Sequence, residues 1–454
     1  MASDSGTQPP AVLKEAEQTP QLDGPGQLAA AFPMGLSLAS RSVHADDYIN
    51  SHPAVAPPMH VSTTFRYSRK PDDLSPWTNV NPAAPYDSHV YARNSAPNTT
   101  RMEAVLTSAL GGPCLTYASG LAAFHAIVVF LNPKRIAIGG GYHGCHGVID
   151  VVARLSGLQK VDLEDEAALA TLRPGDVIHV ETPLNPTGEA RDLAHYRRVA
   201  DKLGCYLTVD ATFAPPPLLD PLALGADVAM HSATKYFGGH SDMLSGVLAL
   251  RPDHAAAWLA RLREDRLFLG SVMGSLEGWL GVRSLRTLEL RVLRQSASAQ
   301  ALVDWLATAT TAPTAPTAPT DADSDSAVLS SFVLKIQHAS LQPEAKDPTS
   351  WLRAQMPNGY GPVFALWLRD ADDARRLPSK LHLFHHATSL GGVESLIEWR
   401  AMSDIGVDKR LLRVSVGVEA WEDLREDLLQ GFRALRADAV AARAGTGGGD
   451  TAAR

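Results

Sequence analysis

The fold is decided by two short stretches, Tyr206-Leu-Thr-Val-Asp210 and Asp227-Val-Ala-Met-His-Ser-Ala-Thr-Lys235. In each stretch an apolar run of strand length is followed at once by polar side chains. Short apolar runs of this kind are typical of buried strands in a parallel sheet. Ligands of such sheets bind beyond the carboxyl ends of the strands. We therefore expect Asp210 and Lys235 to lie near a ligand.

Further runs of strand length alternate with helical patterns on both sides of these stretches. The pattern from Thr100 to Leu110 predicts a helix that ends at Gly111, and Asp192 is placed to cap another helix. The additional strand candidates are Arg135–Ile138, Asp176–Val180 and Gly246–Leu250. Alternating strands and helices predict an α/β domain with a mainly parallel sheet that is covered on both faces.

The pattern changes after about residue 290. Strand candidates follow at 332–336, 363–368 and 411–416, and the helix that begins near Trp421 carries apolar residues at three- and four-residue steps. We therefore predict a smaller C-terminal α+β domain. The proposed divisions are a mobile leader (1–40), an N-terminal arm (41–98), a large domain (99–285), the C-terminal domain (286–440) and a disordered tail (441–454).

The C-terminal domain contains a segment of biased composition, residues 308–327. It holds three copies of Thr-Ala-Pro, from Thr311 to Pro319, and then an acidic run from Asp321 to Ser326. A proline at every third residue prevents a regular helix, and an acidic run is poorly suited to burial. We therefore predict a solvated insertion.

Composition excludes several classes of protein. The chain has 454 residues, 45% of them apolar, with 41 basic and 49 acidic side chains and a net charge of −8. This charge offers no attraction for nucleic acid or an anionic membrane surface. There is no apolar stretch of about 18 residues and no basic patch followed by an apolar run near Met1. The three cysteines show no zinc spacing. We expect a cytoplasmic enzyme or binding protein without a metal site.

The polar residues at the strand ends suit one cofactor. Pyridoxal phosphate needs a lysine for its Schiff base and a carboxylate beside its pyridinium nitrogen, and Lys235 and Asp210 could supply them. Ser232 and Thr234 could donate to its phosphate. A second phosphate element is Gly120-Leu121, which opens an apolar helix whose free N–H groups and dipole favour an anion.

The run Ser232-Ala-Thr-Lys-Tyr-Phe-Gly-Gly-His-Ser-Asp242 resembles the cofactor-lysine signature of the Cys/Met metabolism enzymes that depend on pyridoxal phosphate, the trans-sulfuration family. The resemblance runs in order from about residue 42 to 430 and includes Pro57–Phe65, Tyr91-Ala-Arg93, Ala118–Ala123, Glu181–Pro186, Pro221–Asp227, Ser389–Ser395 and Leu412–Glu419. It implies pyridoxal-phosphate fold type I, which is aspartate-aminotransferase-like.

The resemblance also implies roles for individual residues. Lys235 would bind the cofactor and move protons, Asp210 would pair with the ring nitrogen, and Thr212 would lie beside the ring. Tyr142 would stack on the ring and act as an acid or base. The phosphate would be held by Gly120, Leu121, Ser232 and Thr234.

Two further residues imply assembly. In the family, the pair matching Tyr91 and Arg93 reaches the phosphate of the neighbouring subunit, and Tyr91 belongs to the implied catalytic set. The implied protein is therefore a dimer or tetramer with shared active sites.

The substrate side of the site follows the family less closely. Arg413 matches the residue that binds the α-carboxylate, with Asn185 and Ser389 as supporting donors. Thr388 stands where many members have a glutamate, and Ala211 where asparagine is common. The loop after Arg93 is longer than usual. The stretch Glu398-Trp-Arg-Ala-Met-Ser-Asp404 replaces a common His-Pro-Ala-Ser-Met-Thr-His.

The resemblance implies γ-replacement or γ-elimination on a homoserine-derived amino acid, as in cystathionine γ-synthase or γ-lyase, within methionine and cysteine metabolism. β-Elimination from cystathionine is the nearest alternative. A carbon nucleophile adding in a specialised pathway is a third. An aminotransferase, or a family member without catalysis, fits the residues less well.

Overall fold

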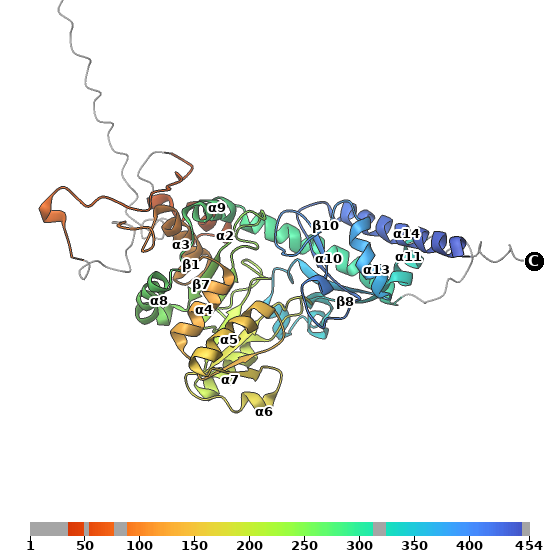
Figure 1. The fold of residues 1–454 in the computed structure, drawn as a ribbon, viewed down its shortest axis with the longest axis horizontal. Coiled ribbons are helices and arrows are strands. Elements are labelled where there is room, and N and C mark those ends of the chain that lie inside the picture. Colours follow the sequence, from red (N-terminus) through yellow and green to blue (C-terminus); the bar gives the residue numbers. More distant parts are fainter. Residues whose placement is uncertain (1–34, 50–53, 77–88, 312–323, 447–454) are drawn as a thin grey trace, which may run out of the picture.

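The computed structural model describes residues 35–49, 54–76, 89–311 and 324–446 (Figure 1). Most of the predicted leader, the centre of the predicted insertion and the end of the predicted tail lie outside the described residues. The described part forms two sheet-containing units, which are joined by the long helix α10 (Leu288–Thr311).

The larger unit is built on a seven-stranded sheet with the order β1-β7-β6-β5-β4-β2-β3. All strands are parallel except β7, which runs antiparallel to both of its neighbours. The prediction of a mainly parallel sheet is therefore confirmed. The strands are β1 (Cys114–Tyr117), β2 (Arg135–Ile138), β3 (Gln159–Asp162), β4 (Val177–Glu181), β5 (Tyr206–Asp210), β6 (Val228–Ser232) and β7 (Gly246–Leu250).

Helices cover both faces of this sheet, and each face has its own apolar cluster. One cluster includes Phe124 of α4 and Ile149 of α5. The other includes Met102 of α3, Leu193 of α7 and Val282 of α9. The helices are α3 (Pro97–Leu110), α4 (Gly120–Leu131), α5 (His143–Ser156), α6 (Glu166–Leu169), α7 (Leu193–Leu203), α8 (Ala255–Leu269) and α9 (Ser275–Leu285).

The helix ends follow local chemistry that is visible in the sequence. The carboxylate of Asp192 accepts a hydrogen bond from the backbone N–H of His195, 3.1 Å away, and so caps α7. The helix α3 stops at Gly111, whose φ of 72° is left-handed. It begins at Pro97 instead of Thr100, because proline at the first helical position loses no hydrogen bond.

The smaller unit contains a five-stranded sheet with the order β10-β11-β12-β9-β8. Its apolar cluster joins Leu302 of α10, Leu329 of α11 and Phe432 of α14 to the inner face of the sheet. The elements are α11 (Asp325–Phe332), β8 (Val333–Gln337), α12 (Trp351–Gln355), β9 (Val363–Leu368), α13 (Ala371–Arg376), β10 (His385–His386), β11 (Leu396–Trp399), β12 (Leu411–Ser415) and α14 (Trp421–Thr446).

Three segments predicted to lack structure are helical at their ends. The helix α2 (Leu38–His44) begins within the predicted leader 1–40, capped by the Ser37 hydroxyl. The insertion 308–327 is helical at both ends, because α10 continues to Thr311 and α11 begins at Asp325. Ser324 caps α11 and Asp325 lies in its first turn, where negative charge is favourable.

The predicted tail, residues 441–454, is also helical at its start. The helix α14 extends to Thr446, past the predicted boundary at residue 440. The residues that carry it past this boundary include several alanines, which have the highest helix propensity.

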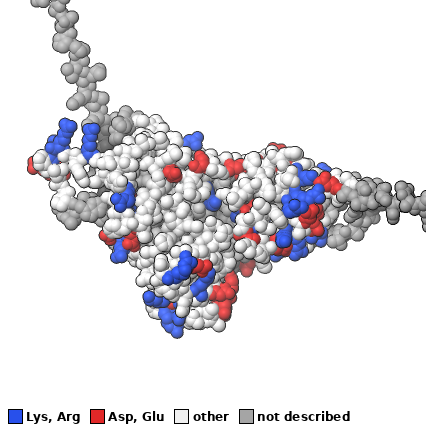
Figure 2. Space-filling model, viewed as in Figure 1, with Lys and Arg blue, Asp and Glu red and all other residues white. Residues whose placement is uncertain are grey.

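Further features of the described residues concern cysteines, possible metal ligands, membrane-spanning helices and surface charge. All three cysteines are buried and free. In the described part of the chain, no group of three or more His, Cys, Asp or Glu side chains could hold a metal, and no helix is long and apolar enough to cross a membrane. Basic and acidic side chains lie intermixed on the face shown in Figure 2.

One close backbone contact fixes the position of α4 against the sheet. Gly246, the first residue of β7, lies against the carbonyl oxygen of Ser119, and a Cβ atom at position 246 would overlap that oxygen. Because Ser119 immediately precedes α4, glycine at this position determines where the N-terminus of α4 lies.

We expect Gly246→Ala to lower the free energy of unfolding by about 1–3 kcal/mol, since the backbone of Ser119 must move to make room. Thermal unfolding followed by circular dichroism measures this. Gly147→Ala within α5 is the control. A Cβ atom there meets nothing within 4 Å, so this variant should be stabilised by up to about 1 kcal/mol. Equal melting of Gly246→Ala and the wild type would contradict the assignment.

Candidate active site

The polar ends of neighbouring strands meet at one edge of the large sheet. Glu181, the last residue of β4, is the register partner of Asp210, the last residue of β5. Ser232 ends the next strand, β6, and Lys235 follows it. These residues border a cavity of about 510 Å³ between the two sheet-containing units.

The structure brings nearly all of the predicted site residues together around this cavity. Its lining includes Gly120, Leu121, Tyr142, Asn185, Asp210, Thr212, Ser232, Thr234, Lys235, Thr388, Ser389 and Arg413. The predicted residues absent from this lining are Tyr91 and Arg93.

Lys235 lies at the centre of the polar contacts. Its Nζ atom donates a hydrogen bond to the Ser389 hydroxyl, 2.8 Å away. Burial, and secondly the charge of Arg413, lower the pKa of Lys235 to about 8. Ser389 has a left-handed φ of 80°, which is uncommon for a residue other than glycine and is often found at functional sites. The amine is therefore held in place, and a larger fraction of it is neutral near physiological pH than in an ordinary lysine.

Asp210 is a buried carboxylate that forms no ion pair with any described residue. Its Oδ1 atom accepts hydrogen bonds from the Thr212 hydroxyl at 2.5 Å and the Thr212 backbone N–H at 3.0 Å. Burial raises its pKa, and these hydrogen bonds oppose the rise. A buried carboxylate of this kind calls for a cationic partner, which a protonated ring nitrogen could supply.

Thr212 links Asp210 to the next strand. Its hydroxyl donates to Asp210 and accepts a hydrogen bond from the backbone N–H of Ser232, 2.8 Å away. The Thr212 side chain, which lines the cavity, is thus fixed from both sides.

Glu181 is a site residue that was not predicted. Its carboxylate accepts hydrogen bonds from the backbone N–H groups of Tyr142, at 2.8 Å, and Asn185, at 2.7 Å. Burial and the nearby Asp210 raise its pKa. A Cβ atom at Gly141 would overlap the carboxylate, so glycine allows this approach. Glu181 therefore positions two predicted site residues. Its place at the end of β4 was the sequence feature that could have identified it as a site residue.

Tyr142 projects at the cavity edge with its side chain partly exposed. It precedes α5, and its ring centroid lies 5.0 Å from that of His143. Burial raises the pKa of its hydroxyl, so this hydroxyl carries its proton at neutral pH.

The N-terminus of α4 forms a cradle that suits an anion. The Ser119 hydroxyl caps the helix by accepting from the N–H of Ala122, 3.1 Å away. A Cβ atom at Gly120 would lie 2.9 Å from Cβ of Ser232, so only glycine allows this close approach. Thr234 exchanges hydrogen bonds with the backbone of Ser245. Helix N–H groups and a serine hydroxyl thus converge at one side of the cavity.

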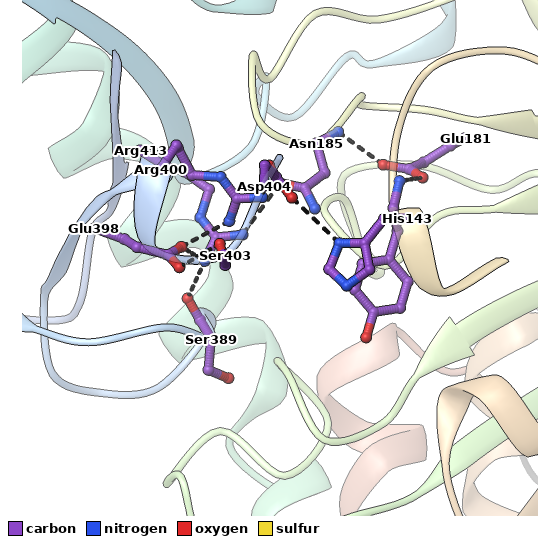
Figure 3. A network of polar contacts seen from close by, with 10 residues as sticks. His143, Glu181, Asn185, Ser389, Glu398, Arg400, Ser403, Asp404 and Arg413 are labelled. Carbon is purple, nitrogen blue, oxygen red and sulfur yellow. Dashed lines mark hydrogen bonds and ion pairs between the residues drawn. The ribbon is translucent and has the colours of Figure 1, made fainter. Parts of the chain in front are cut away.

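Arg413 provides a buried cation on the part of the cavity wall that comes from the smaller unit. It lies on β12, directly across from Glu398 on β11. Its guanidinium donates to the Glu398 carboxylate at 2.7 Å, the Ser389 carbonyl at 2.9 Å and the Asn185 side-chain oxygen at 3.1 Å (Figure 3). Burial lowers its pKa to about 10, so it remains charged at neutral pH. Such a fork is suited to a substrate carboxylate.

A chain of ion pairs extends from this arginine to the large unit. Arg400 donates to Glu398 at 2.7 Å and also pairs with Asp404, and Asp404 lies 3.2 Å from Nδ1 of His143 on α5 (Figure 3). None of these four residues was predicted as a site residue. The departure of the stretch Glu398–Asp404 from the family sequence was the available signal for three of them.

Tyr91 and Arg93 lie away from the cavity of their own chain. Tyr91 is 43% exposed and forms an isolated bridge with Thr64. The Arg93 guanidinium lies 5.4 Å from the centre of the Tyr91 ring. Their role in a neighbouring subunit remains a prediction.

Pyridoxal phosphate fits this arrangement of donors and charges. The cavity presents an amine of lowered pKa, a buried carboxylate without a described cationic partner, and a helix N-terminus. These are the three partners that the cofactor requires.

Comparisons with known proteins agree with this geometry. The chain is 32% identical to a cystathionine gamma-synthase of Escherichia coli, over 88% of this chain and 97% of the relative. It is 30% identical to a cystathionine gamma-lyase of Saccharomyces cerevisiae, over 87% and 97%. The crystal structure of a methionine gamma-lyase from Micromonospora echinospora, in its apo form, matches with a TM-score of 0.71 and 31% identity, over 88% of this chain and all of that one.

The family model for Cys/Met metabolism PLP-dependent enzymes matches residues 39–433. This match covers most of the chain, and the predicted resemblance is confirmed. The chain belongs to the Cys/Met metabolism family of enzymes that depend on pyridoxal phosphate.

Proposed function

We propose that this enzyme replaces or eliminates the γ-substituent of a homoserine-derived amino acid. The observation that carries the proposal is the position of Lys235, whose amine of lowered pKa lies in the cavity shared with Asp210 and Arg413. A γ-reaction needs a base that can work at more than one carbon, and a lysine side chain has the length to do so. The names of relatives, cystathionine gamma-synthase and cystathionine gamma-lyase, support the proposal.

Pyridoxal phosphate, when bound, supplies an electron sink that stabilises the negative charge left by a departing proton. Lys235 and Asp210 would hold it, together with the cradle at Gly120 and Ser232. Asp210 would keep a proton on the ring nitrogen by pairing with it.

Different residues of the chain then act on different parts of the substrate. Arg413 and Asn185 bind and orient the α-carboxylate. The neutral Nζ of Lys235 accepts the proton from Cα and then handles the proton at Cβ, while the γ-substituent leaves. Tyr142 carries a proton at neutral pH and lies at the edge of the cavity, so its hydroxyl could protonate the leaving group.

β-Elimination from cystathionine is the second candidate. A cystathionine beta-lyase of Lactococcus lactis is 31% identical over 74% of this chain and 87% of that relative. The same base and carboxylate receptor serve both reactions, since β-elimination needs only the removal of the Cα proton.

A substrate panel separates these reactions. O-Acetylhomoserine, O-succinylhomoserine and cystathionine are each supplied with and without cysteine, and the products are identified by mass. We expect 2-oxobutyrate without cysteine, and cystathionine from an ester with cysteine. Lys235→Ala should reduce turnover at least about a hundredfold because the base is lost. Pyruvate as the keto acid formed from cystathionine would replace the γ-proposal with the β-alternative.

The lowered pKa of Lys235 predicts how the cofactor-free protein takes up pyridoxal phosphate. Attack on the aldehyde requires the neutral amine, whose fraction rises with pH through the pKa of about 8 and then levels off. The uptake rate, followed by visible absorbance, should therefore be half-maximal near the pKa of about 8 and level off above about pH 9. N-α-Acetyl-lysine in solution is the control and should keep gaining reactivity up to the ordinary lysine range. The same continuing rise in the protein would contradict the lowered pKa.

We also propose a dimer or tetramer in which Tyr91 and Arg93 complete the site of a neighbouring subunit. Support comes from their exposed position outside the cavity of their own chain and from the guanidinium fork that suits phosphate. The three free cysteines are compatible with a cytoplasmic location.

Subunit mixing tests this assembly. Tyr91→Phe/Arg93→Ala chains mixed and refolded with Lys235→Ala chains should be more active than either variant alone, because some sites then receive intact residues from both chains. As a control, Lys235→Ala chains are mixed with chains that carry all three changes, and no activity should appear. A lack of complementation between chains shown to have mixed would contradict shared sites.

A further inference from the structure

The proposed chemistry leaves one histidine of the cavity unused. His143 begins α5 and lines the cavity beside Tyr142. Its side chain is 62% exposed, so the imidazole is accessible to molecules that enter the cavity. Imidazole is the side chain most often used in general acid–base catalysis. What each of its two nitrogens contacts therefore decides whether it can take part.

One imidazole nitrogen is held by a carboxylate from the smaller unit. Nδ1 of His143 lies 3.2 Å from Oδ1 of Asp404, and Asp404 also pairs with Arg400 (Figure 3). A carboxylate that pairs with a guanidinium accepts hydrogen bonds and does not donate them. The hydrogen of the neutral imidazole is therefore assigned to Nδ1, which donates it to Asp404.

The other imidazole nitrogen is free to exchange a proton. Figure 3 shows it on the side of the ring that is turned away from Asp404. Among the described residues, Nε2 has no hydrogen-bond partner. With the hydrogen on Nδ1, Nε2 carries a lone pair and can accept a proton. The nearby Asp404 carboxylate favours the imidazolium that results. This is the arrangement of a catalytic dyad of carboxylate and imidazole.

The other ionisable residues of the cavity lining are already engaged. In the proposed chemistry Lys235 handles the protons at Cα and Cβ, while Tyr142 keeps its own proton at neutral pH. Both carboxylate oxygens of Glu181 accept backbone N–H groups, and Asp210 serves the ring nitrogen. The two arginines of the lining have no lone pair to accept a proton. His143 is thus the available base for a molecule that enters the cavity.

We propose that His143 is the catalytic base for an incoming thiol and that Asp404 is its positioning residue. The inference rests on the proposed γ-replacement, in which the γ-substituent leaves with its bonding electron pair. The S–H bond of the thiol then breaks, its proton passes to Nε2, and the sulfur bonds to Cγ. The electron pair displaced at Cγ moves toward Cβ, where Lys235 returns a proton. His143 releases its proton to solvent, and solvent protonates the departed substituent.

The acidity of the thiol sets the size of the expected effect. An ordinary cysteine thiol has a pKa of about 8.5, so about one in thirty is ionised at pH 7. A base in the cavity is therefore worth up to about thirtyfold at pH 7, and its value falls as the pH rises. The ionisable neighbours of the imidazole include Asp404, Tyr142 and His146, and Arg400 acts through Asp404.

The test compares two rates of the holoenzyme with O-acetylhomoserine: cystathionine formation with cysteine, and 2-oxobutyrate formation without it. Only the first uses a thiol. In His143→Gln the ratio of the first rate to the second should fall roughly tenfold to thirtyfold at pH 7 and recover by about pH 9, where the thiol ionises unaided. Asp404→Asn should lower the ratio less. His195→Gln is the matched control, since His195 is exposed on α7 outside the cavity.

Chemical rescue separates a catalytic role from a structural one. Because His143 is exposed at the cavity, imidazole in solution should restore cystathionine formation in His143→Ala. If the wild type forms no cystathionine, γ-replacement itself fails and the inference falls with it. If the wild type forms cystathionine but His143→Gln keeps the ratio or imidazole restores nothing, only the inference is wrong. Should both His143 variants fail to fold, the ratio in Asp404→Asn decides it.

Discussion

The site depends on the parallel register of β4, β5 and β6. Glu181 and Asp210 are register partners, and Asp210 is in turn paired with Met230, two residues before the end of β6. This register delivers all the strand-end side chains to one edge of the sheet. Because side chains alternate between the two faces of a strand, a slip of one residue would turn Asp210 away from the cavity. The buried cores on both faces oppose such a slip.

The same edge of the sheet brings several ionisable side chains together where they are shielded from solvent. Burial raises the pKa values of Asp210 and Glu181 and lowers that of Lys235. Each shift disfavours the charged form, as expected when solvation is lost. A cofactor with a cationic ring and an anionic phosphate complements these groups at both ends. On the substrate side, Arg413 stays charged because Glu398 is placed directly opposite it.

Much of the cofactor side could be predicted from the sequence, because it depends on local features. Asp210 ends a strand, Lys235 follows one, and Gly120 opens a helix, so local periodicity located them. The substrate side could not be predicted in this way. Glu398 lies on a short strand that was not predicted, and its pairing with Arg413 depends on register between separate segments. The pair of His143 and Asp404 joins residues distant in sequence. The antiparallel direction of β7 likewise has no local signal.

Locating the bound cofactor tests the role of Lys235 most directly. The holoenzyme is treated with borohydride, which fixes a lysine-linked cofactor irreversibly, and the digested protein is mapped by mass spectrometry. We expect one modified lysine, Lys235, and no fixed cofactor in Lys235→Ala. A cofactor attached to a different lysine, or an unmodified Lys235 in protein that retains the cofactor, would contradict it.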